Sequence, residues 1–415
     1  MRKDSDTVTA PARVTRAPHA SERSSGQRRV RSIGAIVVVV ALLALWPLLA
    51  PNAYMLSAGV IVLNYAVLAT GWNIMGGFTG YISLGHIAFF GLGAYGTGLI
   101  VRDTGMNSFV ALGIAALIVL VVAIPVGYAA LRVRGASFVI VTIALVLVLQ
   151  LVFQSWRSFT GGSEGLVVPR PFDMLRPEMH QTFYFLFLGL LAVALLVWAM
   201  IDLSQFGSGL KGVREDEDKA ESLGIPTAGL KLVAFAISAV VVGLAGGLYG
   251  LWFGDLDPIF QFDVVLSSQV VLMALLGGSR FLFGPLLGAI IVGSALEYFV
   301  LEFGQSQFHL VATGILLAVV VLFLPDGVLT GAQSLWRRFR HQGETSIREM
   351  SAEELRATQT ASAGPSGSSR SAPAAGSAAP AVGPDTVTAD GRVVADDERT
   401  DADPADDEGG NHDRG

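Results

Sequence analysis

Cysteine is absent from the 415-residue sequence, and charged residues make up only 15% of it. The missing thiols exclude disulfides, thiolate catalysis and cysteine-ligated metal sites. A soluble chain would carry about 25% charged residues. The deficit, together with 52% hydrophobic residues, indicates a membrane protein.

Lysine is also rare, and its four positions exclude one kind of chemistry. Lys3, Lys211, Lys219 and Lys231 all lie outside any G-x-x-x-x-G-K-[ST] phosphate-binding loop. The sequence also has no H-E-x-x-H metal motif and no nucleophile elbow. We therefore expect no enzyme activity, and no cofactor, metal ion or nucleic acid bound by this chain.

Long apolar runs fill most of the sequence between residues 33 and 325. A membrane-spanning helix needs about 20 residues at 1.5 Å per residue, and most runs reach that length. Three of them are short, interrupted by glycine or nearly fused, so they could be broken or re-entrant. The predicted fold is an all-α polytopic membrane protein with about ten helices. The runs are 33–50, 55–75, 83–101, 109–131, 135–154, 183–203, 230–253, 264–279, 281–301 and 308–325.

The two ends of the chain differ in charge but share a composition typical of disorder. Residues 1–32 hold eight Lys or Arg against three Asp or Glu, and residues 342–415 hold six against fifteen. Both are rich in small and polar residues and poor in aromatics, so we expect little packed structure. No A-x-A-like cleavage site follows the first apolar run, which favours an uncleaved span over a signal peptide.

The distribution of basic residues predicts the orientation. With the basic arm in the cytoplasm, ten alternating spans place most loop Lys and Arg inside and both termini inside. The predicted regions are a disordered cytoplasmic arm (1–32), a transmembrane domain (33–330) with a polar loop at 204–230, and a cytoplasmic, mostly disordered acidic tail (331–415).

Glycine is abundant in the apolar runs, notably in "GWNIMGGFTGYISLGHIAFFGLGAYGTG" (71–98). In lipid, small residues let helix backbones approach closely and gain van der Waals contact. This interpretation accounts for most of the glycines. The predicted helix-packing glycines are Gly76, Gly80, Gly85, Gly243, Gly247, Gly284 and Gly288.

Packing does not explain the polar residues that cluster at a probable chain break in the same stretch. Irregular backbone at membrane depth needs protein or a watery cavity around it, and broken helices near a binding site are a transporter device. His86 is either a hydrogen-bonded packing residue or a substrate ligand. Glu297, the only carboxylate well inside a span, is expected to snorkel. The candidates for a substrate pathway are Asn64, Asn73, Thr79, Ser83, His86 and Thr142.

The polar loop contains "GVREDEDKAESLGI" (212–225), a charged run that predicts a short helix. Gly224, with Pro226 just beyond, is a helix stop signal, and the acids at 215–218 suit a helix N-terminus. Such a helix is either a solvated connection or a docking surface for a soluble partner, and the residues alone favour neither.

Four motifs, in order over roughly residues 55–325, carry a family resemblance. They are "GWNIMGGFTGYISLGHIAFFGLGAYGTGLI", "RGASFVIVTIALVLVLQLVF" followed by "FTGGSEGL", "GVREDEDKAESLGI" followed by "KLVAFAISAVVVGLAGGLYG", and "MALLGGSRFLFGPLLGAIIV". Together they resemble LivM-type permeases of branched-chain amino acid ABC importers. Ser137 and the pair Ser279–Arg280 depart from the usual family pattern.

The resemblance implies the ABC importer permease fold, in a bacterial plasma membrane, translocating leucine, isoleucine or valine. It implies a LivH-type sister permease, two subunits that use ATP-Mg, an extracytoplasmic substrate-binding protein and surrounding lipid as partners. Permeases for urea or short amides, a stand-alone secondary amino-acid carrier and a membrane scaffold are the alternatives. The coupling residues carried over by resemblance are Arg214, Glu215, Asp216, Glu217, Asp218, Ala220 and Gly224.

Overall fold

The computed structural model describes residues 20–50, 52–172, 176–303, 311 and 314–315. The chain divides into two units, Met1–Ile347 and Arg348–Gly415, and all described residues belong to the first. The predicted acidic tail (331–415), the first 19 residues of the basic arm and nearly all of the apolar run 308–325 lie outside the described residues.

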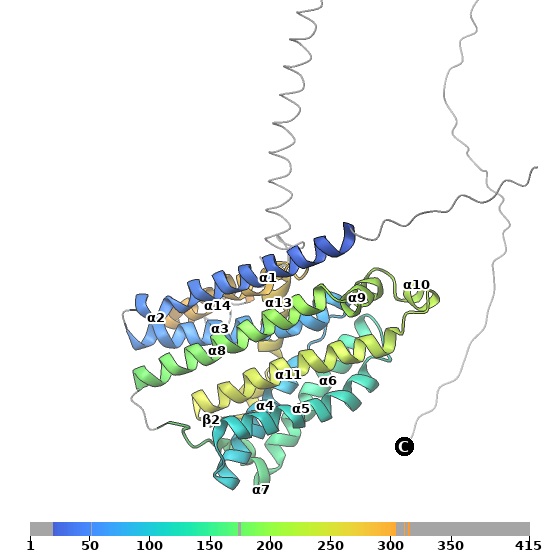
Figure 1. The fold of residues 1–415 in the computed structure, drawn as a ribbon. Coiled ribbons are helices and arrows are strands. Elements are labelled where there is room, and N and C mark those ends of the chain that lie inside the picture. The colour runs from blue at the N-terminus through green and yellow to red at the C-terminus, as the bar shows by residue number, and fades with distance from the viewer. Residues whose placement is uncertain (1–19, 51, 173–175, 304–310, 312–313, 316–415) are drawn as a thin grey trace, which may run out of the picture. The chain divides into compact units, whose positions relative to one another are not determined.

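The described part of the chain is helical apart from two short strands (Figure 1). The strands β1 (Leu166–Val167) and β2 (Asp255–Leu256) pair antiparallel. A single-turn 3-10 helix covers Gly162–Glu164. The α-helices are α1 (Ala20–Ala44), α2 (Trp46–Leu49), α3 (Ala53–Thr79), α4 (His86–Thr104), α5 (Ser108–Ala130), α6 (Ala136–Ser155), α7 (Arg157–Thr160), α8 (Arg176–Asp202), α9 (Gln205–Glu215), α10 (Glu217–Ser222), α11 (Thr227–Phe253), α12 (Pro258–Gln261), α13 (Val264–Gly277) and α14 (Gly284–Phe303).

Eight helices within the described residues are long and apolar enough to cross a membrane. They correspond to eight of the ten predicted runs. Of the other two, 83–101 forms α4, which begins only at His86 and ends in the charged pair Arg102 and Asp103, and 308–325 falls outside the description. The predicted all-α membrane fold is therefore confirmed for the described part of the chain.

The first helix begins earlier than expected. α1 starts at Ala20, within the arm for which the composition predicts disorder, and continues into the first apolar run. Helix propagation adds one hydrogen bond for each residue fixed, so a run of residues with acceptable helix propensity extends a helix that the apolar segment has already nucleated. Only 6% of the apolar segment of α1 is buried, against 67% for α11, which makes α11 a central helix and α1 a peripheral one.

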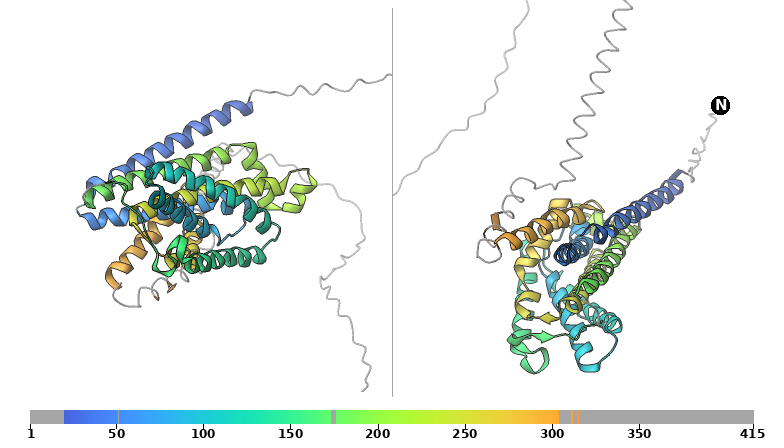
Figure 2. Two further views of the ribbon diagram at one scale, coloured as in Figure 1. Left: turned by 90° about the horizontal axis from the view of Figure 1, so that it is seen from below. Right: turned by 90° about the vertical axis from the view of Figure 1, so that its left-hand side faces the viewer.

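The long helices run alternately between two ends of the bundle (Figures 1 and 2). At one end, α9 and α10 meet the end of α3, as the hydrogen bond from Arg214 to the Gly77 carbonyl shows. At the other end, the loop before α8 meets the end of α11 through the pairing of Leu166 with Leu256. We call the first the elbow end, after the segment 203–226 that contains α9 and α10, and the second the strand end.

Glycine brings backbones into direct contact in the centre of the bundle. A Cβ atom added at Gly93 on α4 would lie 1.9 Å from the Gly243 carbonyl oxygen on α11, and one at Gly246 would lie 2.0 Å from the Phe90 carbonyl oxygen. No side chain fits at such distances. The packing of α4 on α11 therefore depends on bare backbone at these positions.

A second close contact joins α13 and α14. A Cβ at Gly288 would lie 1.8 Å from the Met273 carbonyl oxygen, and one at Gly284 would lie 1.9 Å from that of Gly278. Among the predicted packing glycines, Gly243 and Gly247 also meet other helices, through Val119 and Leu112. Gly85 also meets another helix, since an added Cβ would lie 3.0 Å from the Cβ of Thr142 on α6. Gly76 lies beside the ring of Trp72 in its own helix, and Gly80 lies at the chain break.

Candidate functional site

The connection between α3 and α4 is an irregular segment, Gly80–Gly85, which we call the break. α3 ends because Gly80 adopts the left-handed conformation (φ 75°) while its N–H donates to the Gly76 carbonyl. Glycine reaches this conformation without steric penalty. Gly80 thus acts as a helix terminator, which differs from the packing role that its spacing with Gly76 predicts.

Side chains from α3 and from two other helices, α6 and α13, satisfy the backbone of the break. The indole of Trp72 donates to the Ser83 carbonyl at 2.7 Å, and the hydroxyl of Ser267 donates to the Leu84 carbonyl at 2.6 Å. The Leu84 N–H donates to the hydroxyl of Thr142 at 3.2 Å. Buried backbone groups need such partners, so the polar residues here hold an irregular chain segment within an apolar bundle.

All six predicted pathway residues are buried, but they form two groups. In the first group, the side-chain hydroxyls form hydrogen bonds with backbone groups in and around the break. This group consists of Thr79, Ser83 and Thr142. Asn64, Asn73 and His86 instead have buried polar atoms without a hydrogen-bond partner among the described residues.

The three unpartnered residues do not lie at one point. His86 packs edge-on against the rings of Phe89 and Phe235. Asn73 lies in the last turns of α3, and Asn64 lies nine residues earlier on that helix, about 14 Å along its axis at 1.5 Å per residue. Leaving a buried polar group unpaired costs about 1–3 kcal/mol of stability. We therefore expect these side chains to form hydrogen bonds in another conformation of the protein.

The elbow consists of two helices, where the charged run predicts one. α9 ends at Glu215, and Asp216 adopts an extended conformation and caps α10, accepting a hydrogen bond from the Lys219 N–H at 3.0 Å. A side chain that bonds the backbone locally competes with continuation of the helix. The predicted stop is present at Gly224, which has φ 82°.

The predicted coupling residues divide between the inside and the outside of the elbow. Arg214 points inward to the Gly77 carbonyl, Glu217 points inward, and Ala220 is buried. Asp216 is partly buried at the joint between the two helices. Glu215, Asp218 and Gly224 are exposed, as are Lys219, Glu221 and Leu223, the last with 82% of its surface accessible.

Glu217 is the centre of an ionic junction that spacing along the chain does not predict. Its carboxylate accepts hydrogen bonds from Lys231 at 2.5 Å and from the hydroxyl of Tyr81 at 2.6 Å. Arg134, in the turn between α5 and α6, lies 3.3 Å from Glu217 and 2.7 Å from Asp218. Burial raises the pKa of Glu217, but the hydrogen bonds from Lys231 and Tyr81 outweigh it and hold the pKa below its ordinary value.

One signal for this junction is visible in the sequence. Lys231 is one of four lysines, and it lies at the start of a long apolar run. Its ammonium is almost fully buried, with 4% of the side chain exposed, and a buried charge requires a partner. The identity of the partners, Glu217 and Tyr81, depends on the fold.

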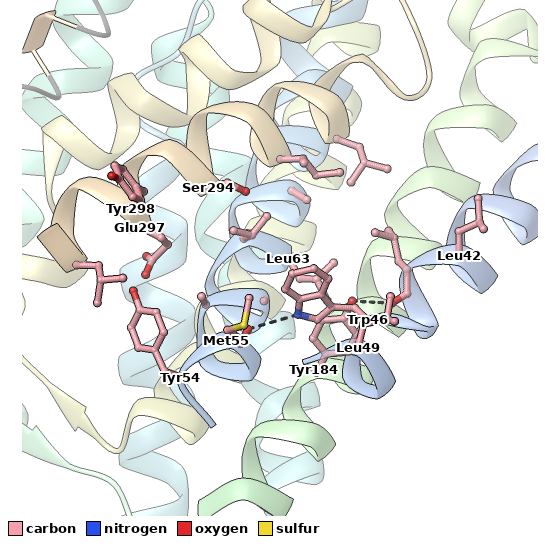
Figure 3. A pocket seen from close by; sticks show the side chains of 18 residues that line it. Leu42, Trp46, Leu49, Tyr54, Met55, Leu63, Tyr184, Ser294, Glu297 and Tyr298 are labelled. Atoms are coloured by element: carbon pink, nitrogen blue, oxygen red, sulfur yellow. Dashed lines mark hydrogen bonds between the residues drawn. The ribbon is translucent and has the colours of Figure 1, made fainter. Parts of the chain in front are cut away.

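A cavity of about 370 Å³ lies on a different part of the bundle, between α1, α2, α3 and α14 (Figure 3). Its walls are mostly apolar, with Trp46, Tyr54, Glu297 and Tyr298 among the lining side chains. None of the six predicted pathway residues lines it. Glu297 lies six residues before the end of α14, near the strand end, which is compatible with the expected interfacial position.

Within the described ranges, no group of three or more His, Asp or Glu side chains is arranged to hold a metal ion. The site is instead a set of backbone contacts, capped helix ends and one ionic junction at the elbow end. Such an arrangement fixes helix ends and the break relative to one another.

Comparison with known proteins identifies the family. Residues 54–324 match the family described as branched-chain amino acid transport system / permease component. The chain is 27% identical over 325 residues to the high-affinity branched-chain amino acid transport system permease protein LivM of Escherichia coli K12, covering 71% of this chain and 74% of LivM.

Other high-affinity branched-chain amino acid transport system permease proteins are also similar. LivH of Escherichia coli K12 is 26% identical, and BraD of Pseudomonas aeruginosa is 24% identical; each match covers 64% of this chain and 91% of the relative. No solved structure matches the chain. The family match covers well over half of the sequence, and the chain is thus a multi-pass membrane protein of the branched-chain amino acid ABC permease family, a non-catalytic component of such transport systems.

Proposed function

We propose that this chain is the LivM-type half of the permease in an importer for leucine, isoleucine and valine. A LivH-type sister forms the other half, two ATP-binding subunits drive it, and an extracytoplasmic binding protein delivers the amino acid. The observation that carries the proposal is the family match over residues 54–324, joined to an elbow that presents a charged surface at one end of the bundle.

The charge distribution supports a cytoplasmic elbow. Lys and Arg near membrane helices favour the cytoplasmic side. The elbow end holds Arg132, Arg134, Lys211, Arg214, Lys219, Lys231 and Arg280, whereas the strand end holds Arg102, Arg157, Arg170 and Arg176. α1 also enters the bundle from the elbow end, which supports a cytoplasmic N-terminus. The proposal places the C-terminus in the cytoplasm as well.

The exposed face of the elbow is the surface proposed to bind an ATP-binding subunit. It offers the acids Glu215, Asp218 and Glu221, the base Lys219, and the apolar side chain of Leu223 at the tip. A tip of this kind combines a small apolar anchor with a charged rim, which is typical of protein interfaces. Arg214 and Glu217 act behind this surface, because their side chains point into the bundle.

The transport step proposed is alternating access powered by ATP binding in the partner subunits. Movement of the elbow shifts the break and exposes Asn73 and His86 to the pathway between the two permeases. Both side chains, whose polar atoms have no protein hydrogen-bond partner among the described residues, can then bond the solute. Together with Asn64, these two side chains offer weak and dispersed polar contacts that suit the passage of a solute.

The experiment that tests this function uses the complete importer. The chain, its sister and the ATP-binding subunits are reconstituted in proteoliposomes with the binding protein, and uptake of radiolabelled leucine is followed with and without ATP. We expect uptake that requires ATP and is competed by isoleucine and valine. Competition by urea or acetamide instead, or uptake by the chain alone without ATP, overturns the proposal.

A further inference from the structure

Glu217, Lys231 and Tyr81 form a closed triangle in which every pair is in contact. Lys231 donates to one carboxylate oxygen of Glu217 at 2.5 Å, and Tyr81 donates to the other at 2.6 Å. Lys231 also lies 3.1 Å from the Tyr81 hydroxyl and 4.8 Å from the centre of its ring. Charge-assisted bonds with both oxygens engaged are among the strongest polar contacts in proteins, so the three side chains move together.

The triangle joins three segments that are distant in sequence. Glu217 is the first residue of α10, Lys231 lies in the first turns of α11, and Tyr81 is the second residue of the break. α10 is thereby attached to the break directly through a side chain. The outer face of α10 is exposed and belongs to the proposed docking surface.

A second contact attaches the elbow to the chain just before the break. Arg214, in the last turn of α9, donates to the Gly77 carbonyl in the last turn of α3. The elbow therefore holds the chain on both sides of the left-handed Gly80: at Gly77 from α9 and at Tyr81 from α10. The aliphatic part of Arg214 also covers Gly80, where an added Cβ would lie 3.3 Å from its Cγ.

The two elbow residues that make these attachments, Arg214 and Glu217, also lie on opposite sides of a joint within the elbow. α9 and α10 are separated by one extended residue, Asp216. A change of angle between α9 and α10 displaces Arg214 relative to Glu217, and therefore Gly77 relative to Tyr81. The torsion angles at Gly80 can absorb such a displacement, since a glycine is free in both φ regions.

The break can respond because side chains, and not a regular backbone ladder, hold it. Trp72 and Ser267 donate hydrogen bonds to the Ser83 and Leu84 carbonyls, and the N–H groups of Leu84, Tyr81 and Gly85 donate to the hydroxyls of Thr142, Thr79 and Ser83. Each of these is a side-chain contact that can be exchanged for another, unlike the backbone contacts of the glycine interfaces. The element that moves is therefore short and is bounded by His86 at the start of α4.

We infer that the elbow acts on the break as a two-point linkage, with Arg214 and the Glu217–Lys231–Tyr81 triangle as positioning residues that convert bending at Asp216 into bending at Gly80. The inference rests on the proposed function, in which an ATP-binding subunit moves the elbow. It assigns a transmission role to Tyr81 and Lys231, neither of which belongs to the docking surface.

The test compares ATP hydrolysis and leucine uptake on the same proteoliposomes. The paired variant Glu217→Gln with Lys231→Met removes both charges without leaving one unpaired, a change that folded proteins often tolerate. Tyr81→Phe removes a single hydroxyl. We expect ATP hydrolysis and copurification of the ATP-binding subunits to persist, while leucine taken up per ATP falls by roughly tenfold in the paired variant, within the range usual for coupling between sites, and by less in Tyr81→Phe.

A matched control removes another Lys–carboxylate pair from the same end. Lys211 contacts Asp202 at 2.6 Å, and its ammonium lies 5.8 Å from the centre of the Phe78 ring near the end of α3, but neither residue hydrogen-bonds to the break. Asp202→Asn with Lys211→Met should leave leucine uptake per ATP unchanged. An unchanged ratio in both the paired variant and Tyr81→Phe, or an equal fall in the control, overturns the linkage. Failure of the proposed function is distinguishable, because the wild-type importer would then show no ATP-dependent leucine uptake.

Discussion

Two contacts in the bundle are built in opposite ways. On one side, α4 meets α11 through glycine, with the backbone at Gly93 and Gly246 so close that no Cβ fits. On the other side, the elbow meets the break through charged side chains centred on Glu217. The first contact gains van der Waals attraction over many atoms, which falls off within a fraction of an ångström. The second depends on a few directional bonds that can change partners.

The difference separates a fixed part of the molecule from a movable part. Apolar side chains give no preference for one helix over lipid, so the core obtains its specificity by removing side chains altogether. At the elbow end, water is near and charges can be used. Substitutions in the two regions should therefore have different consequences, and the predictions below run from the largest effect to the smallest.

The largest effect is expected from Gly246→Val. A Cβ here would lie 2.0 Å from the Phe90 carbonyl oxygen, and backbone cannot move aside as a flexible side chain can. Overpacking typically costs about 1–3 kcal/mol and occasionally more. Because the clash is with backbone, we expect a loss above that range, with little monodisperse protein on size-exclusion chromatography. Gly189→Val, on α8 with nothing within 4 Å of its added Cβ, serves as the control. Equal yields of the two variants would contradict the backbone contact.

Lys231→Met alone should be the next most harmful change. It leaves the buried Glu217 without its main partner, and breaking a buried ion pair from one side costs about 3–5 kcal/mol. The lower end is expected, because Arg134 remains 3.3 Å from the carboxylate. Adding Glu217→Gln should restore much of the loss. Thermal unfolding in detergent of both single variants and the pair completes a double-mutant cycle, and additive losses would argue against direct coupling.

A pH dependence should follow from Glu217. Its pKa is held below the ordinary value, so its ionised form stabilises the fold above the ordinary Glu pKa of about 4.3, and this stabilisation is lost as the pH falls through the lowered value. The melting temperatures of wild type and Glu217→Gln should differ by a constant amount while the pH stays well above the ordinary Glu pKa, and they should converge as the pH falls below it through the lowered pKa of Glu217. The exposed Glu221→Gln is the control on the same helix, and a gap that widens in acid would reverse the sign assigned here.

The smallest effect is expected at the joint of the elbow. Asp216→Ala removes the cap of α10, a loss of about 1 kcal/mol. Hydrogen exchange of the Lys219 amide should accelerate, whereas the amides of α4 and α11 should be unaffected. Asp216→Asn can still cap the helix and should protect that amide almost as well as the wild type. Equal acceleration in the two variants would mean that the negative charge, rather than the cap, holds α10.

The sequence predicts much of this architecture because lipid imposes simple requirements. Length and hydropathy identify the spanning helices, as the runs at 109–131 and 230–253 illustrate against α5 and α11. The chain break after Thr79 is also visible, since glycine and polar residues interrupt an apolar run. The glycine spacing indicates close packing, but it does not separate Gly80, a terminator, from Gly243, which meets another helix.

The ionic junction could not be predicted in the same way. Tyr81 and Glu217 are 136 positions apart, and neither belongs to a periodic pattern that would bring them together. The split of the elbow at Asp216 was equally hidden, because Asp favours a helix N-terminus and is also tolerated inside a charged helix. Residues 214–224 contribute in three ways: some contact the bundle, one caps α10 and others form the exposed surface. Which residue does which depends on the direction in which each side chain points.

The spacing within the triangle also bears on how the chain enters the membrane. Glu217 and Lys231 are only 14 positions apart, and the carboxylate leaves the ribosome first. The short separation lets the ammonium meet its counter-ion within one local segment, so the charge of Lys231 can be compensated before distant helices pack. Tyr81, 150 positions before Lys231, adds the long-range contact that completes the triangle.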